Sequence, residues 1–108
     1  MHELLFVCQQ NLVRSPACER YFNQRLASES QSGYHASSAG LSRYCQRPLT
    51  ESIVQSAHRI IACDTTVSSI LHGKFSNYTD KMDTLQIRND GSNITGELAV
   101  YYDSGVWR

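Results

Sequence analysis

The stretch FVCQQNLVRSPACERYF, Phe6–Phe22, decides the fold, because it joins an apolar run to a helical pattern through a short loop. The run Glu3–Cys8 is short and apolar, which is typical of a buried strand. After the loop, apolar residues recur at helical spacing, and we expect this helix to end near Ser28. Ser15 is a suitable N-cap, and Pro16 is well tolerated in a first helical turn. The stretch therefore predicts a strand, a loop and a helix in succession.

The same alternation of strand and helix patterns continues along the chain. The further strand candidates are Tyr34–Gly40, His58–Cys63 and Met82–Ile87. Thr50 and Asp64 are expected to cap the two helices between these strands. Strands that alternate with helices predict right-handed crossovers and a parallel sheet, so we expect an α/β fold. The aromatic tail, residues 98–108, is expected to dock on its core.

Length and composition narrow the class of protein. The chain has 108 residues, which suits one domain over residues 1–108. Its formal net charge of zero argues against binding to nucleic acid or to an anionic membrane surface. No apolar run could span a bilayer, and the N-terminus is too short and too acidic for a secretion signal, so a cytoplasmic location is expected. The cysteines and histidines show no metal-ligand spacing, and neither a metal nor a cofactor is expected.

The loop between Cys8 and Arg14 has the features of an anion site. In an open parallel sheet, ligands bind beyond the carboxyl ends of the strands, and Cys8 lies at such an end. The intervening backbone N–H groups can turn inward above a helix N-terminus and bind a dianion, while Arg14 clamps its oxygens. The same positive field would lower the pKa of Cys8, whose thiolate could attack phosphorus. The residues expected to bind phosphate are Gln9, Gln10, Asn11, Leu12, Val13, Arg14 and Ser15.

A simpler interpretation of this loop also exists. A cysteine at a strand end is often only a small buried apolar residue, and Cys-x5-Arg by itself occurs by chance. The position of the pattern between a strand and a helix favours the phosphate loop.

The segment CQQNLVRSP, Cys8–Pro16, resembles the loop of the low-molecular-weight protein tyrosine phosphatases, Cys-x-x-Asn-x-x-Arg-Ser followed by Pro. SSAG, Ser37–Gly40, resembles their Ser-Ala-Gly turn, and Arg47–Asp64 resembles the helix and strand that follow. The resemblance covers roughly the first two-thirds of the chain and fits a short bacterial and phage branch of the family. It implies a three-layer sandwich with a four-stranded parallel sheet in the strand order 2-1-3-4, and a phosphate-binding loop after the first strand.

The resemblance also implies a role for each matched residue. Cys8 would be the nucleophile, and Arg14 would bind phosphate and stabilise the transition state. Asn11 would hold the loop with a left-handed backbone, and Ser15 would donate a hydrogen bond to the Cys8 thiolate. Further support for the loop would come from the neighbouring strand, from Ser37 or Ser38. The ordinary polarity of a strand end explains these two serines equally well.

The general acid of the family has no clear counterpart. Family members supply it as an Asp, usually in Asp-Pro, near the C-terminus, but aligning the tail by its GEL places Thr95-Gly96 there. Asp90 and Asp103 are the two candidates, although each could be a solvated turn residue. Loss of a general acid typically slows such a reaction about 100- to 10,000-fold.

The expected function is hydrolysis of phosphotyrosine or a similar aryl phosphate monoester through a phosphocysteine at Cys8. The partners would be a phosphorylated protein or a small aryl phosphate, with inorganic phosphate or sulfate as ligand or inhibitor. An alternative is a phosphate- or phosphoprotein-binding module with weakened catalysis. Arsenate reduction is a third hypothesis, because Cys63 falls near one of the two further cysteines that it needs. Cys18 and Cys45 are expected to be packing and surface residues.

Overall fold

The computed structural model describes residues 1–108 and contains one four-stranded sheet. Its strands are β1 (His2–Cys8), β2 (Tyr34–Gly40), β3 (Arg59–Ala62) and β4 (Met82–Thr84). All neighbouring strands are parallel, and their order is β2-β1-β3-β4. The predicted α/β fold and strand order are confirmed.

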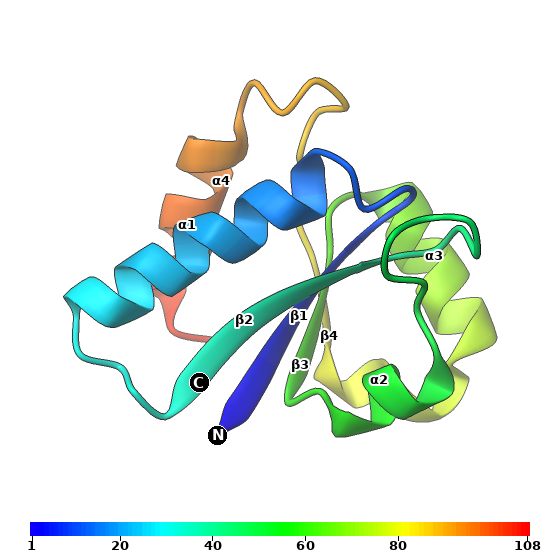
Figure 1. The fold of residues 1–108 in the computed structure, drawn as a ribbon, viewed down its shortest axis with the longest axis horizontal. Helices are drawn as coiled ribbons and strands as arrows, with labels where there is room; N and C mark the ends of the chain where they lie inside the picture. Colours follow the sequence, from blue (N-terminus) through cyan, green and yellow to red (C-terminus); the bar gives the residue numbers. More distant parts are fainter.

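Helices cover both faces of the sheet and complete the three layers (Figure 1). Helices α1 (Arg14–Ser28) and α4 (Ile94–Ser104) lie on one face. Helices α2 (Glu51–Ser56) and α3 (Thr65–Lys74) lie on the other, and a 3-10 helix, η1 (Ser76–Lys81), precedes β4. Strand β1 is buried on both sides because alternate side chains enter the two cores. Leu4, Phe6 and Cys8 face α1 and α4, whereas Leu5 and Val7 face α2 and α3.

Two of the three predicted helix caps are present. Thr50 accepts a hydrogen bond from the Ile53 backbone N–H at 3.2 Å, and Asp64 accepts one from Val67 at 2.8 Å. The prediction for Ser15 was wrong, because α1 begins at Arg14, so that the N-cap position is Val13, two residues earlier, and has no side-chain cap. The Ser15 hydroxyl turns into the preceding loop instead, where it has other partners.

The end of the chain packs as expected. The fourth strand is shorter than predicted, but Ile87 still donates to the Cys63 carbonyl at 2.9 Å, so the chain continues beside β3. The aromatic tail then docks through α4 and the segment after it. Trp107 is completely buried and donates its indole N–H to the Tyr102 carbonyl at 2.9 Å. Its ring lies edge-on to Phe22 of α1, so these aromatic residues build the core.

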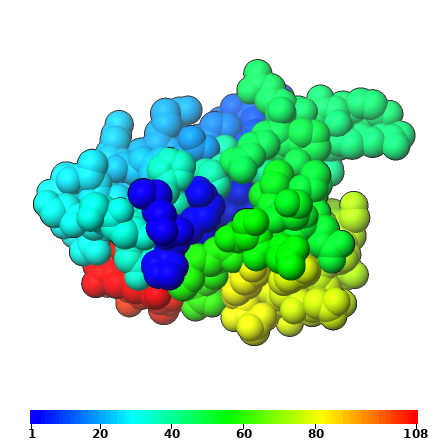
Figure 2. Space-filling view, turned by 60° about the horizontal axis from the view of Figure 1, so that its bottom comes forward, coloured from blue at the N-terminus to red at the C-terminus, as the bar shows by residue number.

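The parallel sheet brings the four strand ends to a single edge. The loops after β1 and β4 lie near the top of Figure 1, beside the start of α1. Figure 2 shows another face, on which the N-terminal residues, in dark blue, and the C-terminal residues, in red, lie at the surface. No helix combines the length and apolar character needed to cross a membrane. In a parallel sheet, ligands bind beyond the edge where the strands end, so a site is expected there.

Candidate active site

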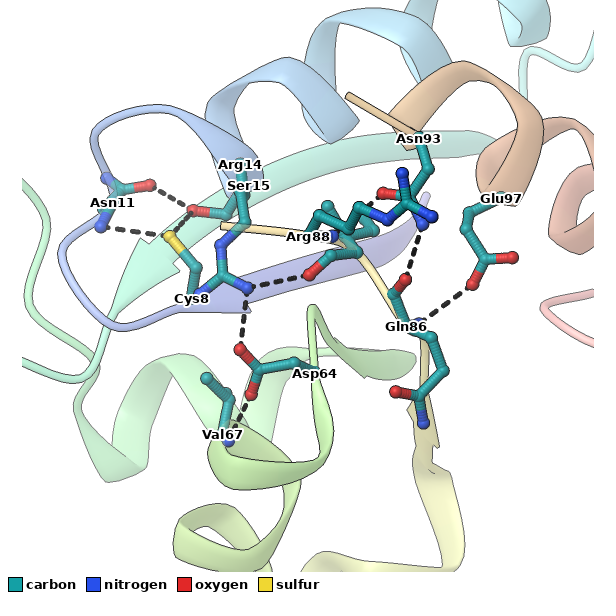
Figure 3. Close-up of polar contacts among 11 residues, drawn as sticks. Cys8, Asn11, Arg14, Ser15, Asp64, Val67, Gln86, Arg88, Asn93 and Glu97 are labelled. Carbon is teal, nitrogen blue, oxygen red and sulfur yellow. Dashed lines mark hydrogen bonds and ion pairs between the residues drawn. The ribbon is translucent and has the colours of Figure 1, made fainter. Parts of the chain in front are cut away.

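The loop after β1 curls around the sulfur of Cys8. The backbone N–H of Asn11 donates to Cys8 Sγ at 3.2 Å, and Asn11 adopts a left-handed conformation with φ of 53°. Asparagine tolerates this conformation better than most residues. Ser15 Oγ lies 3.0 Å from Cys8 Sγ and 2.8 Å from Asn11 Oδ1 (Figure 3). Asn11 and Ser15 thus contact each other and Cys8 within the loop.

The segment directly after β2 supports the loop through its backbone. Leu41 donates its backbone N–H to the Cys8 carbonyl, and Ser42 donates to the Gln9 carbonyl, both at 3.0 Å. Gly40 leaves no room for a side chain, since a Cβ there would lie 3.1 Å from Asn11 N and 2.7 Å from Cys45 Sγ. Cys45 was expected at the surface, but it is half-buried, and its sulfur lies beside Gly40.

The structure does not bring Ser37 or Ser38 to Asn11. Ser38 donates to Glu19 on α1 at 2.7 Å, and the buried Ser37 hydroxyl has no partner in the chain. Neither hydroxyl therefore bonds to Asn11. The expectation for these two serines was therefore wrong.

A small cavity opens above Cys8. Its volume is about 170 Å³, which suits a group as small as a phosphate rather than a large ligand. Its walls are formed by Cys8, Gln9, Gln10, Leu12, Val13, Arg14 and Asn89. The loop thus brings five of the seven expected phosphate-binding residues, and Cys8, to one cavity, with Asn11 and Ser15 behind it.

Arg14 is held in the cavity wall by two groups distant in sequence. Its Nη1 donates to Asp64 Oδ2 at 2.7 Å and to the Ile87 carbonyl at 3.1 Å (Figure 3). The chain offers no partner to Nε or Nη2, so this edge of the guanidinium is free to bind an oxyanion with two parallel hydrogen bonds. Burial favours a higher pKa for Asp64, but the Val67 N–H and Arg14 hold the pKa of this carboxyl below its usual value. The ion pair therefore persists at neutral pH.

The Ile87 carbonyl is itself fixed by the segment around α4. Asn93 donates to the Gln86 carbonyl at 2.8 Å and accepts from the Arg88 backbone N–H at 2.9 Å. Glu97 accepts from the Gln86 backbone N–H at 2.9 Å (Figure 3). The loop after β4 is thus tied to α4, and it presents one backbone oxygen to Arg14.

Cys8 is an ionised thiol at neutral pH. The neighbouring Cys63 thiol has the largest effect and, against the opposing effect of burial, lowers the pKa of Cys8 to about 5, with help from Ser15 and Asn11. A thiolate is the nucleophilic form of cysteine. The cavity therefore has a negatively charged sulfur at its floor and an arginine in its wall.

A sequence model described as "Low molecular weight phosphotyrosine protein phosphatase" matches residues 3–82. The chain belongs to this family. No curated protein matches the chain at a significant level.

Several solved structures have the same fold, among them a low-molecular-weight protein tyrosine phosphatase. The enzyme of T. tengcongensis superimposes with a TM-score of 0.83 at 18% identity, covering 96% of this chain and 99% of that one. The protein tyrosine phosphatase of Entamoeba histolytica gives 0.72 at 23% identity, with 78% and 70% covered. A YwlE mutant from Bacillus subtilis gives 0.68 at 24% identity, with 78% and 71% covered.

The two candidate acids of this phosphatase lie in different places. Asp103 pairs with Arg25, at 3.1 Å, in the last turns of α1. At 1.5 Å per residue, Arg25 lies about 16 Å along the helix from Arg14, so Asp103 is far from Cys8. Asp90 follows Asn89 of the cavity wall, but its carboxylate accepts from the Ser92 backbone N–H, which lowers its pKa. Neither Asp90 nor Asp103 lines the cavity.

Three features of the phosphatase site were missed from the sequence. Asp64 was expected only as a helix cap, and no role was expected for Ile87 or Asn89. All three follow β3 or β4 at the edge where Cys8 lies. The rule that parallel strands end at a shared ligand site could have indicated them.

Proposed function

We propose that this chain hydrolyses phosphotyrosine or similar aryl phosphate monoesters through a phosphocysteine intermediate at Cys8. The observation that carries the proposal is the cavity in which the Cys8 thiolate lies beneath the loop amides and beside the free edge of Arg14. The positive field of the loop and helix start suits a dianionic phosphate.

In the first step, the Cys8 thiolate attacks phosphorus while the bond to the leaving phenolate oxygen breaks. The loop amides and Arg14 hold the three equatorial oxygens, whose charge they stabilise in the transition state. In the second step, water attacks the phosphocysteine and releases inorganic phosphate, and the thiolate returns. Inorganic phosphate or sulfate would bind the same loop as an inhibitor.

Ser15 has a specific part in this sequence. Its hydroxyl carries one proton and lies near both Asn11 Oδ1 and Cys8 Sγ. Hydrogen bonds to a charged acceptor are the stronger ones, so donation to the thiolate is favoured once Cys8 ionises. This bond stabilises the sulfur as the group that leaves in the second step.

The surroundings of the cavity suit an aryl group. Leu12 and Val13 are 69% and 57% exposed in the loop itself. Tyr44 is 83% exposed, in the segment that is bonded to the loop through Ser42. Exposed apolar side chains beside a small polar cavity favour a substrate with a flat apolar ring.

Turnover of nitrophenyl phosphate tests the proposal. We expect hydrolysis by the wild type, none by Cys8→Ser, and a strong loss in Arg14→Lys, which keeps the charge but not the planar clamp. If every aryl substrate forms the same phosphocysteine, this intermediate should divide between water and added glycerol in the same way. The ratio of phosphate to glycerol phosphate should then be the same for all aryl substrates. Failure of folded wild type to release nitrophenolate between pH 5 and 8 would exclude the proposal.

The position of the carboxyls favours a second candidate, a phosphate-binding module with little turnover. Neither Asp90 nor Asp103 lines the cavity, and Asp64 is engaged by Arg14. Calorimetry with phosphate and an aryl phosphopeptide would separate the two functions. Binding to a wild type without turnover, lost in Arg14→Ala, would support the module.

A further inference from the structure

Three free cysteines lie together beneath the phosphate loop. Cys8, Cys18 and Cys63 are buried members of the same apolar cluster, and each is at most 3% exposed. The proposed reaction uses the sulfur of Cys8 alone. The other two thiols have no part in that reaction, and Cys63 is the one that lies beside Cys8, directly after the neighbouring strand.

Cys8 and Cys63 are placed side by side by the sheet. Strands β1 and β3 are parallel, their last paired residues are Val7 and Ala62, and the two cysteines follow directly. The Cys63 backbone N–H donates to the Val7 carbonyl at 2.9 Å, so the ladder continues to this position. Both side chains point to the face of the sheet covered by α1 and α4.

This placement suits a disulfide. Neighbouring strands lie about 4.8 Å apart. Disulfides usually join residues whose Cα atoms are about 4.4 to 6.8 Å apart. Adjacent positions on one face of two paired strands therefore have a Cα separation within this range.

The two thiols also differ in reactivity, because one is an accessible thiolate and the other is a buried, protonated thiol. Cys8 lines the cavity and is ionised, so a small oxidant can reach a reactive thiolate. Cys63 is completely buried, and the Cys18 and Cys8 side chains together with burial raise its pKa, so it stays protonated beside Cys8. Oxidation should therefore begin at Cys8 and be completed by its neighbour.

We propose that Cys63 is a resolving thiol that captures peroxide-oxidised Cys8 in a reversible Cys8–Cys63 disulfide. The Cys8 thiolate attacks one oxygen of hydrogen peroxide, the O–O bond breaks, and hydroxide leaves and is protonated to water. The sulfur is now a sulfenic acid. Cys63 attacks this sulfur, the S–O bond breaks, and the departing hydroxide takes the Cys63 proton as a second water. Two thiols are oxidised by two electrons, and one peroxide is reduced to two waters.

The disulfide removes the nucleophile from the phosphate loop, and a dithiol returns it. The loss of activity on oxidation rests on the proposed function. Formation of the disulfide does not, because it needs only the two thiols and peroxide. It also protects Cys8, since a sulfenic acid without a neighbouring thiol proceeds to irreversible sulfinic and sulfonic acids.

Peptide mapping tests the pair directly. Cleavage after Lys and Arg, except before Pro, places the four cysteines in four different peptides: residues 1–14, 15–20, 44–59 and 60–74. The reduced wild-type protein is treated with a small excess of hydrogen peroxide, its free thiols are alkylated, and it is digested without reductant. We expect peptide 1–14 linked to peptide 60–74, with a mass two hydrogens below the sum, and its release by dithiothreitol.

Matched variants separate the four cysteines. Cys18→Ser and Cys45→Ser should form the same linkage as the wild type. In Cys63→Ser, peptide 1–14 should gain two or three oxygen atoms and resist dithiothreitol. A wild type that leaves peptides 1–14 and 60–74 unlinked, or that links 1–14 to 15–20 or 44–59, would overturn the proposal. Since the map needs no turnover, a linked but inactive wild type would remove the proposed function alone, and an active but unlinked one would remove this inference alone.

Discussion

The carboxylate of Asp64 lies 2.7 Å from Nη1 of Arg14, although the two residues are separated by 50 positions in the chain. The other carboxylate oxygen of Asp64 accepts from the first turn of α3, at the Val67 N–H. One side chain thus begins a helix and orients the arginine of the phosphate loop. Together with the Ile87 carbonyl, it leaves only one edge of the guanidinium for a ligand.

Asp64→Asn should lower activity more than stability. Asparagine caps a helix about as well as aspartate, so the free energy of unfolding should change by less than about 1 kcal/mol. The lost charge frees Arg14 from its fixed orientation, and loss of such a supporting partner typically costs about 10- to 100-fold in activity. Values of kcat/KM for nitrophenyl phosphate and thermal unfolding measure the two effects. Asp64→Ala, which also loses the cap, is the control, and equal kcat/KM in Asp64→Asn and wild type would contradict the assigned role.

Alkylation of Cys8 by iodoacetamide should be half-maximal near pH 5, because the pKa of Cys8 is lowered to about 5. Since Cys63 is the principal cause, Cys63→Ala should move the midpoint toward that of an ordinary thiol. Cys63→Ser, which keeps a donor, should move it less. A midpoint that is the same in both variants and the wild type would show that Cys63 does not act on Cys8.

The same ionisation links stability to pH. The folded pKa of Cys8 lies below its ordinary value of 9.0, so the unfolded chain binds more protons between these two values. Stability should therefore rise with pH through this window, be complete above the unfolded pKa, and be lost as the pH falls through about 5. Urea unfolding of wild type and Cys8→Ser at several pH values measures the difference. A difference that stays constant with pH would argue against a thiolate in the folded state.

Hydrolysis should depend steeply on the leaving group. Because neither Asp90 nor Asp103 lines the cavity, a poor leaving group such as phenolate should leave about 100-fold or more slowly than nitrophenolate. Asp90→Asn and Asp103→Asn should each change the rate on phenyl phosphate little. An acid limb of the pH–rate profile that disappears in one of these variants would instead identify that residue as the proton donor.

Gly40→Ala should disturb the loop from below. A Cβ at this position would lie 2.7 Å from Cys45 Sγ and 3.0 Å from Asn11 Cβ, and overpacking of this kind costs about 1–3 kcal/mol. We expect lower thermal stability and a higher KM for nitrophenyl phosphate. Adding Cys45→Ala should recover part of the stability, since it removes the shortest of these contacts. Gly33→Ala is the control, because nothing lies within 4 Å of a Cβ there.

Much of the fold and of the loop was predicted from local patterns. The apolar run before Cys8, the helix after Pro16 and the caps Thr50 and Asp64 depend on neighbours within a few positions, so the residues themselves indicate them. The spacing of Cys8 and Arg14 is likewise local. Errors arose where one group could form either of two hydrogen bonds. The Ser15 hydroxyl, for example, contacts Cys8 in the loop and does not cap the helix.

The sequence by itself determined the alternation of strands and helices and the position of the thiol and the arginine around one loop. Only the tertiary structure decided which distant groups meet them: Asp64 and Ile87 at Arg14, Cys63 at Cys8, and the backbone at Gly40 rather than Ser37 or Ser38 at Asn11. The physical reason is that parallel crossovers bring separate strand ends to one edge. Strand register and the alternation of side chains then choose which atoms face the loop, and no local pattern carries that information.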